Sequence, residues 1–240
     1  MERREIIDPR KLDYYYEEAM KTLRTNVLYS GKDVKTILLT SYFPNEGKSD
    51  IAMQLAKELG SMGKRVLLFD ADIRKSALIK RYSVQGETKG LSQYLSGQAE
   101  VKDILYASNY KNMDIVFAGP TVPNPSELLE EQSLTILLKE LRKYYHYIII
   151  DCPPLGSVID AAIIAKQCDG AIMVIESDRV SYKEAQRAQE QIKKADCKIL
   201  GAVLNKVDTK TNTVEEMTEK EKNIIPREKK NRNRNKKNQK

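Results

Sequence analysis

The sequence has few of the residues that build disulfide frameworks, histidine metal centres or membrane spans. Its three cysteines, Cys152, Cys168 and Cys197, have no paired spacing, and His146 is its only histidine. This pattern predicts reduced, mostly buried thiols and disfavours a metal site built on histidine. No apolar run approaches the roughly 20 residues that cross a bilayer, and the first residues lack the apolar core of a secretion signal. We therefore expect a cytoplasmic protein whose membrane role, if it has one, comes through a partner.

Positive charge is concentrated at one end of the chain. The formal net charge is +7 at pH 7, and residues 227–240 alone contain eight Lys or Arg and one Glu. Residues 1–226 are therefore neutral overall, so the basic pI gives no reason to expect a nucleic-acid groove. We predict that residues 209–240, which contain almost no apolar side chains, form a disordered basic tail. A tail that binds anionic lipids is a less favoured alternative.

Apolar strands alternate with amphipathic helical patterns over most of the sequence. Continuous aliphatic strands separated by helices are typical of a parallel sheet covered on both faces. We therefore predict a doubly wound α/β fold with a mainly parallel sheet and helices on both faces, spanning residues 31–208 after an N-terminal arm and helix at 1–30. The expected strands are 35–40, 65–69, 113–117, 147–150, 170–175 and 199–204, and the expected helices are 15–28, 49–61, 125–143, 157–167 and 181–195. Short helices are also expected near 90–96 and 100–106.

Residues 35–49 run from a buried strand into a short loop that ends in Gly-Lys-Ser and enters a helix. A polyphosphate needs converging backbone N–H groups, a helix N-terminus, a cation and a hydroxyl for magnesium. Gly47 lets the backbone approach such a ligand, Lys48 can reach its phosphates, and Ser49 can ligate Mg²⁺. Tyr42 stands where the usual first glycine of the motif would be. A polar turn is the alternative, but the flanking strand and helix favour a P-loop NTPase-like nucleotide site.

Three acidic residues follow buried strands. Asp70 and Asp72 come at the end of one strand and Asp151 at the end of another. Each alone is as well explained as a turn former or helix cap. Because ligands bind at the carboxyl ends of parallel strands, the three acids together with the loop favour a phosphoryl-transfer site that holds Mg²⁺.

These segments together resemble the bacterial tyrosine kinases, a family on a P-loop ATPase scaffold that regulates capsule and exopolysaccharide synthesis. The family's loop, Ser-x-x-Pro-Gly-Glu-Gly-Lys-Ser, is matched at residues 41–49 and also lacks the first Walker glycine. Its second motif, Asp-x-Asp-x-Arg-Lys, is matched at 70–75, and its third at Asp-Cys-Pro-Pro, 151–154. Segments 90–97 and 119–129 also look like the family.

The resemblance implies an ATP- and Mg²⁺-dependent protein-tyrosine kinase. Lys48 would bind ATP and support catalysis, Asp70 would be the base for the tyrosine hydroxyl, and Asn205 would bind the adenine unless it is only a strand-end turn. The implied metal ligands are Ser49, Asp72 and Asp151, and the implied nucleotide contacts in the loop are Pro44, Asn45, Glu46, Gly47, Lys48, Ser49 and Asp50. The implied partners are a transmembrane activator of the chain-length-determinant class, protein tyrosine substrates and other copies of the chain in a ring formed through residues 14–28.

Two residues of the loop depart from the family pattern. Asn45 replaces a glycine, and because Asn tolerates positive φ better than other non-glycine residues, we expect the loop conformation to be preserved. Asp50 replaces the more usual hydroxyl residue. Its carboxylate either approaches the α-phosphate or points outward and favours the helix N-terminus.

The expected interface helix and the phosphate acceptors depart as well. Residues 18–24 resemble the family's Glu-x-x-Arg-x-x-Arg segment with Lys21 for the first Arg, although an ordinary helix with paired charges explains them equally well. The family's C-terminal tyrosine cluster is missing, since no tyrosine follows Tyr182. Residues 14–16, three tyrosines, are one candidate acceptor, although packing of these rings within the helix is the favoured interpretation. A separate protein is the other candidate.

Two other functions remain open at this point. A switch ATPase resembling the plasmid-partition and division-site-selection proteins would normally carry a second lysine early in the loop, where this chain has Phe43. A regulatory module that binds ATP without transferring phosphate would agree with Asp50 and the missing tyrosine cluster. The controlled polysaccharide, the substrates and the oligomeric state do not follow from the sequence.

Overall fold

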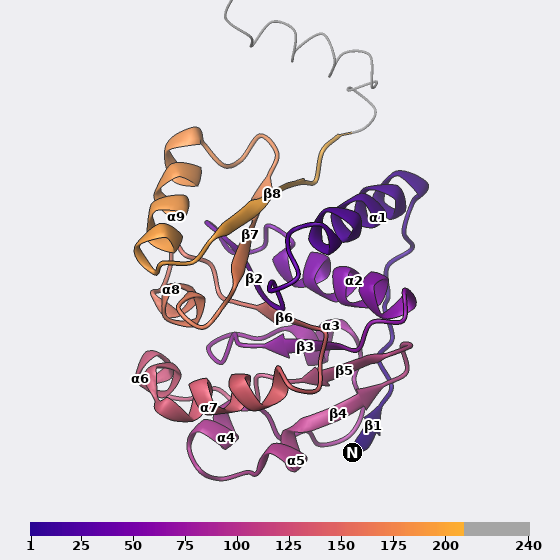
Figure 1. Cartoon of the computed structure of the whole chain (residues 1–240), viewed down its shortest axis with the longest axis vertical. Coiled ribbons are helices and arrows are strands. Elements are labelled where there is room, and N and C mark those ends of the chain that lie inside the picture. Colours follow the sequence, from indigo (N-terminus) through magenta and orange to yellow (C-terminus); the bar gives the residue numbers. More distant parts are fainter. Residues whose placement is uncertain (209–240) are drawn as a thin grey trace, which may run out of the picture. The chain divides into compact units, whose positions relative to one another are not determined.

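The computed structural model describes residues 1–208. The predicted tail at 209–240 lies outside the described residues. Residues Met1–Lys206 form one compact unit built on a sheet (Figure 1). Its strands are β1 (Glu2–Arg4), β2 (Thr36–Ser41), β3 (Val66–Asp70), β4 (Leu105–Ser108), β5 (Met113–Val116), β6 (Tyr147–Asp151), β7 (Gly170–Glu176) and β8 (Ile199–Asn205).

The sheet formed by residues 1–208 has eight strands in the order β1-β4-β5-β3-β6-β2-β7-β8. Neighbouring strands are parallel except for the antiparallel pair β4 and β5. Every residue of β2 and β3 is buried, as expected for central strands of a sheet that is covered on both sides. The predicted α/β class and mainly parallel sheet are confirmed.

Helices cover both faces of the sheet (Figure 1). One apolar core lies between the sheet and α1 (Tyr14–Leu28), α2 (Lys48–Ser61) and α3 (Leu78–Arg81). The other lies under α4 (Leu91–Leu95), α5 (Val101–Ile104), α6 (Pro125–Glu130), α7 (Gln132–Leu141), α8 (Asp160–Ala165) and α9 (Tyr182–Lys194). The apolar side chains of α7 show why it packs there, because Leu134, Leu137, Leu138 and Leu141 are all buried on one face.

Three details differ from the sequence prediction. The helix expected at 125–143 is two helices, because Glu131 has extended backbone at φ −59° and ψ 143° and interrupts the hydrogen-bond ladder. The helix expected at 100–106 ends at Ile104, and the chain continues as β4, which pairs with β5. Strand β1 was not expected; it pairs with β4 at the sheet edge.

The three cysteines are free, and Cys152 and Cys197 are buried, as predicted. Within residues 1–208, no helix has both the length and the apolar character needed to cross a membrane.

Candidate active site

The loop between β2 and α2 has the conformation of an anion cradle. Gly47 has φ 93° and immediately precedes the first residue of α2, Lys48. Asn45 has φ 67°, which confirms the expectation that Asn substitutes for glycine here. The free N–H groups at the start of α2 and the positive end of its dipole therefore face the loop, an arrangement suited to phosphate.

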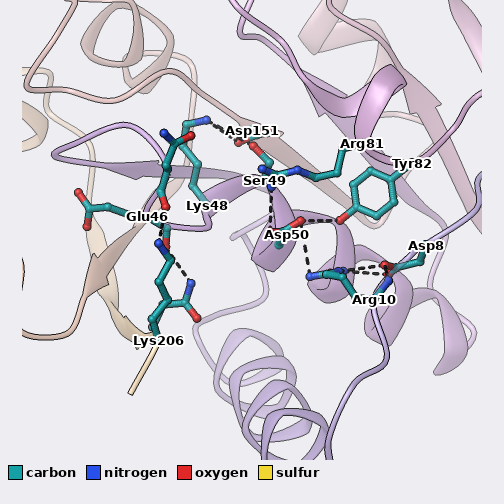
Figure 2. A network of polar contacts seen from close by, with 12 residues as sticks. Asp8, Arg10, Glu46, Lys48, Ser49, Asp50, Arg81, Tyr82, Asp151 and Lys206 are labelled. Atoms are coloured by element: carbon teal, nitrogen blue, oxygen red, sulfur yellow. Dashed lines mark hydrogen bonds and ion pairs between the residues drawn. The ribbon is translucent and has the colours of Figure 1, made fainter. Parts of the chain in front are cut away.

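Glu46 holds the loop from the inside. Its side chain is fully buried and accepts hydrogen bonds from the backbone N–H of Phe43 and, at 2.8 Å, from that of Glu176 on β7. Asn205, at the end of β8, donates its amide to the Glu46 carbonyl at 2.8 Å, and Lys206 donates to the Asn45 carbonyl at 2.8 Å (Figure 2). The carboxyl ends of β7 and β8 thus brace the loop.

The carboxylates lie together because of strand register. Asp70 and Asp151 are direct register partners on β3 and β6, so their side chains end at the same edge of the sheet. The ammonium of Lys48 lies 3.6 Å from Asp151 and 3.9 Å from Asp72, and 3.3 Å from the hydroxyl of Ser49. The fold therefore brings a lysine, a hydroxyl and three acids from three segments to one place.

Burial shifts the pKa values of the ionisable side chains that meet at this site. Burial raises the pKa of Asp70 to about 8, helped by the charge of Asp151 and partly offset by a hydrogen bond from Ser76. Burial also raises the pKa of Asp151, although Lys48 opposes the shift. For Lys48 itself, burial lowers the pKa, but Asp151 and Asp72 outweigh burial and the pKa is raised. The lysine is therefore a permanent cation facing the acids.

A cavity of about 480 Å³ opens above these groups. Pro44, Asn45, Gly47, Lys48, Ser49, Asp72 and Asp151 are the predicted site residues that line it. Four others do not: Asp70 is fully buried, Glu46 and Asn205 brace the loop, and the carboxylate of Asp50 contacts Arg81 and Tyr82 of the α3 region. Asp70 connects to the cavity through Ser76, which lines it and donates its hydroxyl proton to the Asp70 carboxylate.

The residues present fit a magnesium ion shared with a ligand. The Oδ1 atom of Asp151 is buried and has no hydrogen-bond partner, although it lies beside Lys48. Asp72 and Ser49 supply further hard oxygen atoms on the cavity wall. Among residues 1–208, no cluster of three or more acid, His or Cys side chains is arranged to hold a metal alone. Mg²⁺ commonly uses one or two carboxylates plus phosphate oxygens and water, which suits this arrangement.

Comparison with known proteins identifies the family. Residues 35–206 match the family model described as AAA domain. The chain is 38% identical over 214 residues to the tyrosine-protein kinase CpsD of Streptococcus agalactiae serotype III, covering 89% of this chain and 92% of that one. The chain belongs to the bacterial tyrosine kinase family. This confirms the resemblance and the kinase activity predicted from the sequence.

Further relatives agree with this family assignment. The tyrosine-protein kinase YwqD of Bacillus subtilis is 35% identical over 202 residues, covering 83% of this chain and 84% of that one. Among solved structures, the kinase domain of the Escherichia coli tyrosine kinase ETK matches with TM-score 0.78 and 28% identity, covering 82% of this chain and 78% of that one. The septum site-determining protein MinD of Pyrococcus horikoshii, complexed with Mg-ADP, matches less well, with TM-score 0.62, 26% identity, and coverage of 71% and 69%. The chain thus shares its scaffold with this septum site-determining protein, which confirms the P-loop fold.

The structure also shows contacts in this tyrosine kinase made by residues to which the sequence assigned no role in the site. Arg74, which lines the cavity, makes a forked contact with Asp160 of α8 through Nε at 2.6 Å and Nη2 at 3.0 Å, which connects the segment after β3 to the start of α8. Ser76 holds Asp70, and Arg81 lines the cavity. Arg74 belongs to a recognised motif, but nothing in the sequence pattern pairs it with Asp160.

Proposed function

We propose that this tyrosine kinase binds MgATP in the cavity at the carboxyl edge of its sheet and transfers the γ-phosphoryl group to tyrosine hydroxyls. The observation that carries this proposal is the position of Lys48. Its ammonium stands at the base of the loop between the hydroxyl of Ser49 and the carboxylates of Asp72 and Asp151. A triphosphate seated on the loop would replace these carboxylates as partner of the lysine.

Magnesium would be held by Ser49, Asp72 and Asp151, directly or through water. When bound, the ion would supply positive charge that offsets the negative charge of the phosphates. Pro44, Asn45 and Gly47 would line the path of the polyphosphate, and Asn205 would be near the nucleotide base while it braces the loop. Glu46 would contact the nucleotide only through its backbone, because its carboxylate already accepts hydrogen bonds from the backbone N–H groups of Phe43 and Glu176.

Asp70 would accept the proton of the tyrosine hydroxyl. The hydroxyl oxygen forms a bond to the γ-phosphorus, the bond between that phosphorus and the β–γ bridging oxygen breaks, and ADP leaves. With a pKa of about 8, Asp70 accepts this proton only in its deprotonated form, which is a minor fraction at neutral pH but a much stronger base than an ordinary carboxylate and better matched to tyrosine, whose pKa is about 10. Ser76, hydrogen-bonded to Asp70 on the cavity wall, would orient the base.

The kinase would regulate capsule or exopolysaccharide synthesis at the inner face of the membrane. A transmembrane activator of the chain-length-determinant class would bring it there, and copies would contact one another through residues 14–28. One observation bears on this helix: Arg24 pairs with Glu58 of α2 at 2.9 Å within the same chain, whereas Lys21 and Glu18 form an exposed pair. Lys21 and Glu18 would therefore be free to contact another copy in a ring, whereas Arg24 would first have to break its ion pair with Glu58.

Phosphotyrosine formation tests the proposal. The full chain, with MgATP and its activator, should form phosphotyrosine, while Lys48→Ala and Asp70→Ala should each lose at least about a hundredfold in rate. Lys32→Ala, which removes an exposed lysine outside the cavity, is the matched control and should keep wild-type activity. Binding of MgATP without any phosphotyrosine in the wild type would instead support a regulatory ATP-binding module.

A further inference from the structure

Asp50 is an acid in the first turn of α2, next to Ser49, and it has three partners from outside the helix (Figure 2). Arg81 donates to its carboxylate at 2.8 Å and the Tyr82 hydroxyl donates at 3.0 Å. The guanidinium of Arg10 lies 3.6 Å away on the same side. Although Arg81 lines the cavity, Asp50 does not, so its carboxylate has the outward orientation considered from the sequence.

Arg10 belongs to an N-terminal arm, residues 5–13, that is fastened along α2. Ile6 is buried in the core, and the backbone N–H of Ile7 donates to the Tyr82 carbonyl at 2.9 Å. Asp8 pairs with Arg10 at 2.8 Å and with Lys57 at 3.2 Å. Because Lys57 lies about two helical turns after Asp50, the arm contacts the same side of α2 at both points.

The contacts within the arm are strongly ionic. Burial raises the pKa of Asp8, but hydrogen bonds from Arg10 outweigh burial and lower the pKa to about 2. Asp8 is therefore charged at neutral pH, and it fixes Arg10 through two nitrogen atoms, Nε at 2.9 Å and Nη2 at 2.8 Å. The guanidinium is held in one orientation, with its remaining nitrogen toward Asp50.

An acid at position 50 needs such partners. A carboxylate one residue from Ser49 would repel a polyphosphate bound at the start of α2 unless nearby cations balance its charge. Arg10 and Arg81 supply that charge. The same contacts tie the first turn of α2 to two segments that are distant in the sequence.

We propose that Arg10 is a positioning residue of the nucleotide site, acting through Asp50. Together with Arg81 and Tyr82, which make the shorter contacts, Arg10 holds the Asp50 carboxylate and thereby fixes the first turn of α2 and with it the Ser49 hydroxyl. The N-terminal arm is then part of the support of the nucleotide loop. This inference rests on the proposed nucleotide site.

The first experiment is calorimetric titration of the full chain with Mg·ADP, together with thermal unfolding without ligand. Arg10→Ala should weaken Mg·ADP binding by about fivefold to tenfold. Lys11→Ala removes the same charge from the adjacent, exposed position of the arm and should change binding by less than about twofold. A lower melting temperature of Arg10→Ala with unchanged affinity would show a purely structural role and overturn the proposal.

A double-mutant cycle with Asp50→Ser tests whether Arg10 acts through Asp50. In the Asp50→Ser background, Arg10→Ala should have no further effect on Mg·ADP affinity. The same loss in both backgrounds would mean that Arg10 acts on the ligand by its charge alone, and the proposal would be wrong. Absence of Mg·ADP binding by the wild type would overturn the nucleotide site itself, whereas equal binding by wild type and Arg10→Ala would overturn only the role of Arg10.

Discussion

The conformation of the nucleotide loop depends on one glycine. Gly47 has φ 93°, and a Cβ atom there would lie 2.1 Å from the amide nitrogen of Asn205. Gly47→Ala should therefore lower the free energy of unfolding by about 1–2 kcal/mol for the left-handed conformation and also push Asn205 off the loop. We expect Mg·ADP affinity to fall at least about tenfold, as measured by calorimetry.

Gly63 provides the matched control for this substitution. It has φ 80°, but nothing lies within 4 Å of a Cβ atom there. Gly63→Ala should cost a similar amount of stability in urea unfolding, because the backbone strain is similar, and should leave Mg·ADP affinity unchanged. Equal affinity of the Gly47→Ala variant and the wild type would contradict the tight approach between the loop and β8.

Asp70 should give the stability of the ligand-free protein a distinctive pH dependence. Its folded-state pKa of about 8 lies above the ordinary value of about 3.9, so the folded state keeps a proton that the unfolded chain releases. The free energy of unfolding should therefore fall as pH rises from about 4 to about 8, by up to about 1.4 kcal/mol per pH unit.

Asp70→Asn removes this titration and should flatten the pH dependence. Urea unfolding between about pH 5.5 and pH 7.5, with EDTA and without nucleotide, measures the slope. Asp33→Asn, at an exposed acid, should retain the wild-type slope. Identical slopes for Asp70→Asn and the wild type would show that Asp70 is charged in the folded state at neutral pH.

At the scale of secondary-structure elements, one ion pair connects the segment after β3 to helix α8. Asp160 is fully buried at the start of α8 and accepts from Arg74, after β3, and at 2.8 Å from Ser126 of α6. Asp160→Asn should lower the free energy of unfolding by about 2 kcal/mol, less than for a fully buried pair because Arg74 is partly exposed. Ser126→Ala, which removes one neutral donor, should cost about 1 kcal/mol. Denaturant unfolding of both variants measures these two losses of stability. A larger loss for Ser126→Ala than for Asp160→Asn would mean that the ion pair with Arg74 contributes little to stability.

Helix α1 determines which of its tyrosines can accept phosphate. Asp13 caps this helix by accepting from the Tyr16 backbone N–H at 2.8 Å, and the rings of Tyr14 and Tyr15 are then 69% and 67% exposed. The hydroxyl of Tyr16 is buried, so packing explains Tyr16 but not its two neighbours. If the chain phosphorylates itself, the modified residues should be Tyr14 and Tyr15.

Phosphosite mass spectrometry after incubation with MgATP and activator tests this expectation. Tyr14→Phe combined with Tyr15→Phe should remove most of the phosphotyrosine, since the hydroxyl acceptors are lost while the rings remain. Tyr29→Phe is the control, because Tyr29 is 85% exposed at the other end of the same helix. Phosphate confined to Tyr29, Tyr144 or Tyr182 would contradict the prediction.

At the scale of the whole molecule, periodicity and motifs predicted what depends on local sequence. The buried strands before Gly47, Asp70 and Asp151 were recognisable because continuous aliphatic runs mark central strands. Strand β4 could not be recognised from the sequence, because its four residues are stabilised as a strand only by pairing with β1 and β5. For the same reason the partners of Asp50 could not be predicted, since residues 10 and 81 meet only in the folded chain.

The nucleotide site should also govern the global stability of the chain. Lys48 faces Asp72 and Asp151, so Lys48→Met leaves buried acids without their cation and should lower the melting temperature of the ligand-free protein. Mg·ADP at about 100 times its dissociation constant should stabilise the wild type by about 2.7 kcal/mol, because the ligand binds only the folded state. Lys48→Met should lose this increment, whereas Lys32→Met, at an exposed lysine, should retain it. Thermal unfolding with and without Mg·ADP measures both effects, and full ligand stabilisation of Lys48→Met would place the nucleotide outside the loop that Lys48 completes.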